Sequence, residues 1–145
     1  MDDIFIDNDA ACNFNNNIQG EYSELYLWLI SRGYLAVSRH ILKEYNDSNN
    51  GSNVGCSILI IIAELTKHNR LNRIEDNRIN AFMRKPHFKH YNFTANYKDK
   101  KHVATIMLSH RQYAISLDNR LVSDVNGFPR FQGVIDTAPS GVPYK

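Results

Sequence analysis

The chain has 145 residues, of which 43% are hydrophobic and 22% are charged, and its formal net charge is +2. This length and composition are typical of one globular domain with a sizeable core. The longest apolar run, Ile58 to Ala63, is far shorter than the roughly 20 residues that cross a bilayer, which excludes a membrane protein of that kind. Cys12 and Cys56 are too few for a disulfide framework and the acidic amino terminus is unlike a secretory signal, so we expect reduced thiols and a cytoplasmic protein.

The first third of the chain alternates short apolar runs with helical patterns. Apolar residues at helical spacing predict a helix from Glu21 to Ser31, which Gly33 stops. Ser38 can cap a second helix that reaches about Tyr45. The other expected elements are a first strand from Asp3 to Asp7, a loop or frayed helix from Ala10 to Gly20, and a second strand from Tyr34 to Val37.

The middle third is harder to assign. The Asn-rich segment from Asn46 to Gly55 is typical of a surface loop, and the run from Ser57 to His68 favours a buried helix. We expect a polar surface helix from Asn69 to Asn80. Pro86 breaks this pattern, and a basic, aromatic loop or strand is expected from Lys85 to Tyr97.

The last third predicts a helix from Asp99 to about Ser109, a strand from Tyr113 to Leu117 and a helical turn or two from Asn119 to Asp124. Glycines and prolines after Asn126 predict an irregular tail, residues 127–145, with at most one edge strand near Phe131 to Ile135. Strands that alternate with helices indicate an α/β fold with a mostly parallel sheet. We expect residues 1–126 to form one domain, on which the tail packs or from which it trails.

Four acids follow strands or lie near helix starts in this arrangement: Asp7, Glu44, Asp99 and Asp118. Side chains at such positions meet in the crevice where α/β sheets bind ligands. Two bare carboxylates about 4 Å apart repel by roughly 4 kcal/mol near a protein surface. A cluster of four therefore predicts a bound divalent cation. The alternative is that each acid is a surface carboxylate or a helix cap, and Asp99 in particular suits a helix start.

These acids and their flanking residues resemble the motifs of a PIN domain, the metal-dependent nuclease fold of many VapC-type bacterial toxins. The resemblance covers about Ile4 to Val122. It lies in the strand that ends at Asp7, in the strand and helix that carry Glu44, in Asp99 before Val103-Ala104-Thr105, and in Ser116 two residues before Asp118. Asp9 departs from the family pattern, which has a small uncharged residue there; it is either an additional ligand or a helix cap.

The resemblance implies a three-layer α/β/α fold and a ribonuclease in which Asp7, Glu44 and Asp99 bind Mg²⁺ or Mn²⁺. Asp118 would complete this catalytic site directly or through water. Such an ion can lower the pKa of a bound water and stabilise charge on the scissile phosphate. The resemblance further implies an RNA substrate, a toxin–antitoxin pair with a small antitoxin protein, and a homodimer. Candidate substrate-binding residues are Ser116, Arg39, Lys43 and Arg120.

Other interpretations stay open. A non-catalytic PIN-like module that binds RNA or a protein is one, and a phosphotransfer receiver or a phosphatase, each with an acidic Mg²⁺ pocket, is another. The basic segment from Lys67 to Lys101, with its aromatics, can hold phosphates and bases or be a solvated surface. We interpret His40, His102 and His110 as surface or packing residues, because no partner lies at a recognisable spacing.

Overall fold

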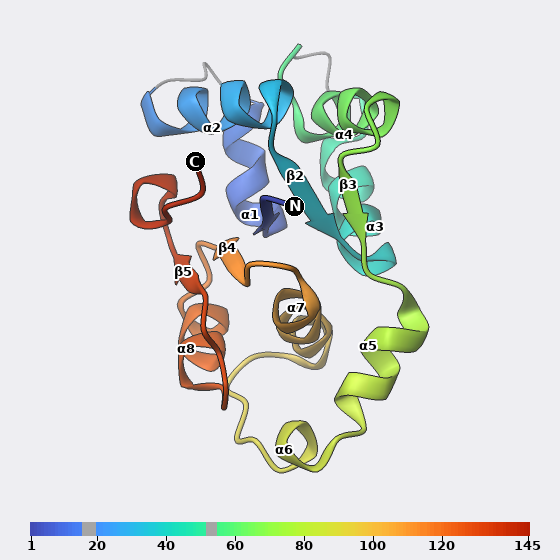
Figure 1. Cartoon of the computed structure of the whole chain (residues 1–145), viewed down its shortest axis with the longest axis vertical. Helices are drawn as coiled ribbons and strands as arrows, with labels where there is room; N and C mark the ends of the chain where they lie inside the picture. Colours follow the sequence, from blue (N-terminus) through green and yellow to red (C-terminus); the bar gives the residue numbers. More distant parts are fainter. Residues whose placement is uncertain (16–19, 52–54) are drawn as a thin grey trace.

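The computed structural model describes residues 1–15, 20–51 and 55–145. Within these ranges the protein is an α/β fold around an all-parallel, five-stranded sheet with strand order β3-β2-β1-β4-β5 (Figure 1). The expected mostly parallel sheet is therefore confirmed. The strands are β1 (Asp3–Ile6), β2 (Tyr34–Val37), β3 (Leu71–Arg73), β4 (Tyr113–Ile115) and β5 (Val134–Asp136).

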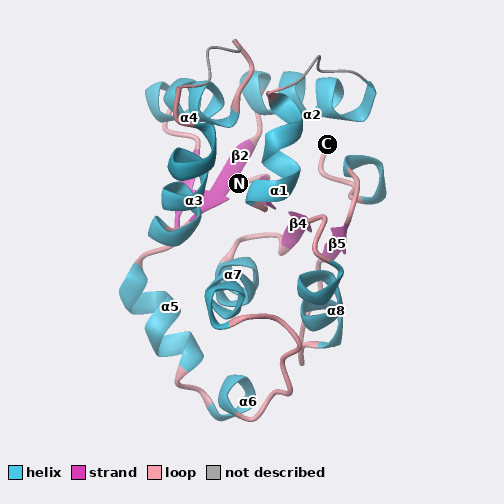
Figure 2. Ribbon diagram, turned by 180° about the vertical axis from the view of Figure 1, so that it is seen from behind, coloured by secondary structure: helices cyan, strands magenta, loops and turns pink. Residues whose placement is uncertain are grey.

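Helices connect the strands and form two groups (Figures 1 and 2). Between β1 and β3 lie α1 (Asn8–Ala11), the 3-10 turn η1 (Cys12–Phe14), α2 (Gly20–Ser31), α3 (Arg39–Asn49) and α4 (Ile58–Lys67). After β3 come α5 (Asp76–Met83), α6 (Pro86–Lys89), α7 (Tyr97–Leu108), α8 (Asn119–Gly127) and the 3-10 turn η2 (Pro139–Gly141). In the first group α3 packs on α1 and α4, and in the second α7 packs on α5 and α8. The chain adds β2 and β3 on one side of β1 and then β4 and β5 on the other. Because parallel crossovers are right-handed, this change of side puts helices α1 to α4 and helices α5 to α8 on opposite faces of the sheet, in three layers.

The core forms where apolar strands meet these helices. All four residues of β1 are buried, and so are Leu35, Ala36 and Val37 of β2. Asp3 is buried with them and is satisfied by the Asn72 amide and by the backbone N–H groups of His110 and Arg111. Gly33 ends α2 against the Trp28 ring, where a Cβ atom would lie 2.5 Å from ring carbons.

Two sequence expectations in the middle of the chain are wrong. The predicted surface helix from Asn69 to Asn80 is strand β3 followed by α5, because Leu71 to Arg73 pair in parallel with β2. The predicted loop from Asn46 to Gly55 is helical as far as Asn49, whose buried amide donates to the Tyr45 carbonyl. Residues 52–54 of that loop lie outside the described part of the chain.

Other boundaries shift by smaller amounts. The expected loop or frayed helix from Ala10 to Gly20 contains the end of α1 and all of η1, with residues 16–19 outside the described part of the chain. The basic segment after Lys85 contains the short helix α6, and α7 begins at Tyr97, two residues earlier than predicted. The edge strand predicted in the tail is β5, which pairs with β4. No helix in the described ranges has the length and apolar character of a bilayer span.

Candidate metal centre

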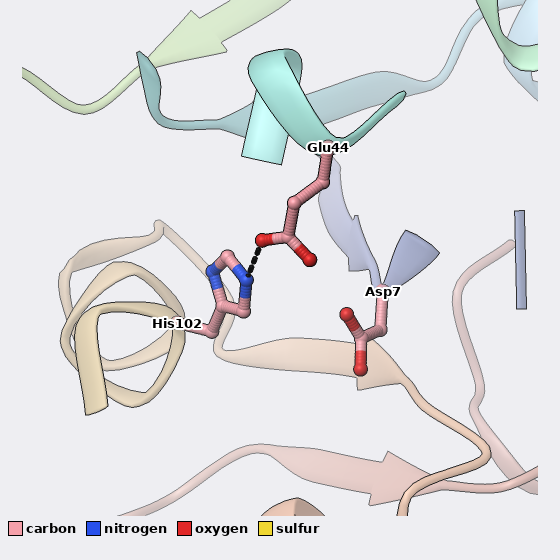
Figure 3. Close-up of side chains that lie close together, drawn as sticks. All are labelled: Asp7, Glu44 and His102. Atoms are coloured by element: carbon pink, nitrogen blue, oxygen red, sulfur yellow. Dashed lines mark hydrogen bonds and ion pairs between the residues drawn. The ribbon is translucent and has the colours of Figure 1, made fainter. Parts of the chain in front are cut away.

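The candidate site lies at the carboxyl end of the sheet, beside β1 and β4. Chain connections leave β1 toward β2 on one side, whereas β4 flanks β1 on the other. This is the switch point at which open α/β sheets bind ligands. Asp7 directly follows β1, and α3 and α7 contribute Glu44 and His102 (Figure 3). Ser116 directly follows β4.

Asp7 is buried with its carboxylate fixed by two hydrogen bonds. Its Oδ1 accepts from the Asn8 backbone N–H at 2.9 Å, which caps α1, and its Oδ2 accepts from the Ser116 hydroxyl at 2.7 Å. Burial raises the pKa of Asp7 from 3.8 to about 6, and the neighbouring Asp9 charge adds to the rise, while Ser116 and His102 oppose it. The pKa of Asp7 is therefore high in the absence of a cation, and a cation bound nearby would favour the charged form of its carboxylate.

Glu44 is brought to Asp7 by its neighbour on α3. The buried Tyr45 hydroxyl donates to the carbonyl of Ile6, the residue just before Asp7. At the start of the same helix Ser38 is the N-cap, as predicted, and its Oγ accepts from the Ile41 N–H at 3.1 Å. The cap and the Tyr45 hydrogen bond fix α3 on the end of β1, so that the carboxylates of Glu44 and Asp7 point toward each other (Figure 3).

His102 is the third member of the group. Its side chain is fully buried against the Phe5 ring, with ring centroids 5.5 Å apart, and its Nε2 hydrogen-bonds the Glu44 carboxylate. Burial lowers the pKa of His102, but the hydrogen bond and charge of Glu44, with Asp7 and Asp99, reverse this and leave the pKa raised. Its buried Nδ1 has no hydrogen-bond partner among the described residues. The interpretation of His102 as a surface or packing residue was therefore incomplete.

Asp7, Glu44 and His102 form one compact group of potential ligands. Each offers one ligand atom, and these atoms all lie within 4.8 Å of one another. Two ligands on opposite sides of a Mg²⁺-sized ion are about 4.2 Å apart, so small side-chain shifts would suffice to close the group around a cation. Two carboxylates and one imidazole are a donor set that divalent metals accept. These residues can therefore hold a metal ion.

Asp99 and Asp118 lie beside this group without belonging to it. Burial raises the pKa of Asp99, which His102 opposes and the charges of Asp118 and Glu44 reinforce, so these side chains are within electrostatic reach. Asp118 caps α8 by accepting from the Arg120 N–H at 2.9 Å. Ser116 connects Asp7 with Asp118, because its hydroxyl donates to the Asp7 carboxylate and its oxygen accepts from the Asp118 N–H at 3.1 Å.

The predicted substrate-binding cations are placed differently from one another. Arg39 is exposed and pairs with Asp76 at 2.8 Å, and Lys43 pairs with Asp47 at the same distance. The exposed Arg120 side chain makes no ion pair within the described ranges. Asp9 accepts from the Leu117 N–H at 3.2 Å and from the Ala10 N–H, so it ties α1 to the segment after β4.

His102 carried a signal in the sequence that could have found it. Asp99 and His102 are three residues apart on one helix, a spacing that puts both side chains on the same face. A carboxylate and a histidine at this spacing are a recognisable pair of potential metal ligands on a helix. The signal was weak because nothing in the sequence shows that this face of α7 turns toward β1.

Comparisons of the chain with protein-family models, with curated proteins and with solved structures gave no significant match.

Proposed function

We propose that the protein is a divalent-metal-dependent endoribonuclease of the PIN type, which uses Mg²⁺ or Mn²⁺ to hydrolyse RNA phosphodiesters. The observation that carries this proposal is the meeting of Asp7, Glu44 and His102 within 4.8 Å at the switch point of a parallel sheet. Asp99 is within electrostatic reach of Glu44 and His102, and Asp118 is within electrostatic reach of Asp99. The PIN resemblance, which rests on the acids Asp7, Glu44, Asp99 and Asp118 and on their flanking residues, suggests the same chemistry.

The chain's own residues have separate tasks in this proposal. Asp7, Glu44 and His102 hold the ion, and Asp99 and Asp118 complete its surroundings directly or through water. When bound, the ion would supply a water of lowered pKa and stabilise charge on the phosphate. Ser116 keeps the Asp7 carboxylate oriented and positions the start of α8. The candidates for holding substrate phosphates are still Arg39, Lys43 and Arg120. Arg39 and Lys43 would first have to exchange their acidic partners for a phosphate.

The biological setting is proposed on the resemblance alone. PIN-type ribonucleases of this size resemble toxins of toxin–antitoxin pairs, so we propose a small inhibitory protein partner, a homodimer and action on cytoplasmic RNA.

The test is an RNA cleavage assay with matched acid-to-amide variants. Wild type with Mn²⁺ should cut mixed RNA and should stop in EDTA. Asp7→Asn and Glu44→Gln should each lose most activity, since each removes a charged ligand. Asp2→Asn and Glu64→Gln are the controls, because Asp2 is exposed, Glu64 is partly exposed on α4, and neither acid belongs to the group. Cleavage that persists in EDTA, or that survives in Asp7→Asn and Glu44→Gln, would contradict the proposal.

A non-catalytic PIN-like module that binds RNA or a protein is the second candidate. The observation in its favour is the His102–Glu44 hydrogen bond, which can neutralise Glu44 without any metal. The other acids of the site argue against a non-catalytic module. They repel one another, and a protein that only binds a partner has no need to hold them together. RNA binding with no metal-dependent cleavage in the same assay would favour this module.

A further inference from the structure

A pocket opens beside Glu44, between α3 and the first turn of α7. Its volume is about 360 Å³, and its walls include Lys43, Tyr97, Lys98 and Lys101 as well as Glu44 itself. Pockets of this size hold small ligands or single building blocks of a polymer. Because Glu44 is shared by the pocket and the candidate metal centre, a ligand in the pocket would lie next to that centre.

Tyr97 gives the pocket an exposed aromatic surface. Tyr97 is 67% exposed, and it is the only aromatic residue among the exposed large hydrophobic residues in the described part of the chain. The Lys101 amino group lies 5.6 Å from the ring centroid, and no other ring packs on Tyr97 within the described residues. An exposed, unstacked ring beside a cation is the arrangement on which single-stranded nucleic acids stack their bases.

The charges of the pocket leave two lysines available. Glu44 is engaged by His102, and Asp47 pairs with Lys43 at 2.8 Å. Lys98 and Lys101 have no acidic partner within the described residues, and they lie one helical turn apart on α7. Two unpaired ammonium groups at one wall of a pocket attract a phosphate.

A larger hollow, of about 590 Å³, lies beyond the ends of β2 and β3 and suits this role less well. Its arginines, Arg39 and Arg73, are balanced by Glu75 and Asp76, and Arg39 already pairs with Asp76. It also has no aromatic residue in its walls. The pocket beside Glu44 therefore combines more of the features that recognise a nucleotide.

We propose that this pocket binds one unpaired nucleotide of single-stranded RNA, with the base stacked on Tyr97 and a phosphate between Lys98 and Lys101. The choice of RNA, and the path of its strand from the pocket to Asp7, rest on the proposed function. This subsite favours single-stranded RNA over a duplex, because a base within a duplex must unpair and leave its stack before it can reach Tyr97.

The test measures binding separately from cleavage. A fluorescein-labelled, unstructured RNA of about 12 nucleotides is titrated with protein in EDTA and followed by fluorescence anisotropy. Tyr97→Ala should weaken binding about tenfold, whereas Tyr97→Phe, which keeps the ring, should stay within about twofold of wild type. Lys145→Gln, at an exposed lysine that pairs with Glu24 on α2, is the control for loss of one positive charge outside the pocket. Circular dichroism shows that each variant is folded.

The lysines are tested by salt dependence. The double variant Lys98→Gln, Lys101→Gln should bind more weakly and should lower the slope of log affinity against log salt by about 0.7, since one phosphate of the single strand is no longer neutralised. A duplex of the same sequence should compete poorly for wild type. The subsite is overturned if wild type fails to bind the single strand, if Tyr97→Ala binds as tightly as Tyr97→Phe, or if the duplex competes equally.

The two proposals fail in distinguishable ways. Tyr97-dependent binding in EDTA without cleavage in Mn²⁺ would remove the nuclease and keep the subsite. Metal-dependent cleavage by wild type with unchanged RNA affinity in Tyr97→Ala would remove the subsite and keep the nuclease.

Discussion

His102 differs from the other five histidines, all of which the structure describes, because its side chain is fully buried and contacts an acid of the candidate centre. Its raised pKa and that of Asp7, about 6, mean that both groups carry protons in mildly acidic solution. A metal ligand must be deprotonated, so a cation has to displace these protons.

Mn²⁺ affinity should therefore rise with pH. At about pH 5 only about one tenth of Asp7 is ionised when its pKa is 6, so the affinity should be at least tenfold weaker than at pH 8. Protonation of His102 should steepen this dependence. Calorimetric titration at several pH values, in buffers of different ionisation enthalpy, measures both the affinity and the protons released. An affinity that does not change between pH 5 and 8 would contradict the assignment of these ligands.

The buried charge of Asp7 should also reduce the stability of the metal-free protein. The folded pKa lies above the unfolded value of 3.8, so between about pH 4 and 6 the folded state holds a proton that the unfolded chain has lost. Stability from this group is consequently greatest in acid and falls as pH rises through that window. The rise of the Asp7 pKa from 3.8 to about 6 corresponds to about 3 kcal/mol.

Asp7→Asn should therefore raise the free energy of unfolding in EDTA by about 1–3 kcal/mol at pH 7.5, and this gain should disappear near pH 4. Urea unfolding at the two pH values measures it. Asp2→Asn, which changes an exposed carboxylate just before β1, should stay within about 0.5 kcal/mol of wild type. A loss of stability in Asp7→Asn at pH 7.5 would show that its hydrogen bonds outweigh its desolvation.

At the scale of elements, α3 links the sheet to the candidate centre. The Tyr45 hydroxyl holds this helix on the Ile6 carbonyl, and the two bonded residues are the chain neighbours of Glu44 and Asp7. A change at Tyr45 should therefore affect both stability and metal binding, although Tyr45 does not belong to the group of potential ligands.

Tyr45→Phe should lower the free energy of unfolding by about 1–2 kcal/mol, because a buried carbonyl loses its donor. It should also weaken Mn²⁺ binding several-fold. Urea unfolding and Mn²⁺ titration measure the two effects. Tyr26→Phe is the matched control, since Tyr26 is partly buried and its hydroxyl makes no hydrogen bond within the described residues. Equal effects of the two variants would show that the Tyr45 hydroxyl has no special role.

Local sequence patterns predicted the elements whose side chains face a core. The apolar run of β2 and the serine cap of α3 are examples, because periodicity and capping act within a few residues. Strand β3 was not predictable in this way. Its residues Leu71 to Arg73 are largely polar, and they are a strand because β2 offers them backbone partners.

Some residues of the candidate site could also be predicted from local sequence, and others could not. The placement of Asp7 and Glu44 after strands β1 and β2 was visible in the chain order, and the structure brings these two acids together. The role of Tyr45 depends on a contact with a residue 39 positions away, and that of His102 on a contact with a residue 58 positions away. No local pattern in the sequence encodes contacts of this range.

At the scale of the whole molecule, the sheet order determines where the chemistry can be. Placing β1 at the centre with β2 and β4 on either side brings three chain segments to one switch point. The helix groups on the two faces then add α3 from one side and α7 from the other (Figures 1 and 2). The proposed function requires a cation to be held where these segments meet.

Titration of the metal-free protein with Mn²⁺ at pH 7.5, followed by calorimetry, tests this directly. Wild type and the exposed-acid control Asp2→Asn should bind Mn²⁺ alike, whereas Asp7→Asn and Glu44→Gln should each bind at least tenfold more weakly, since each loses a charged ligand. Wild type that binds no Mn²⁺, or Asp7→Asn and Glu44→Gln variants that bind it as tightly as wild type, would contradict the account.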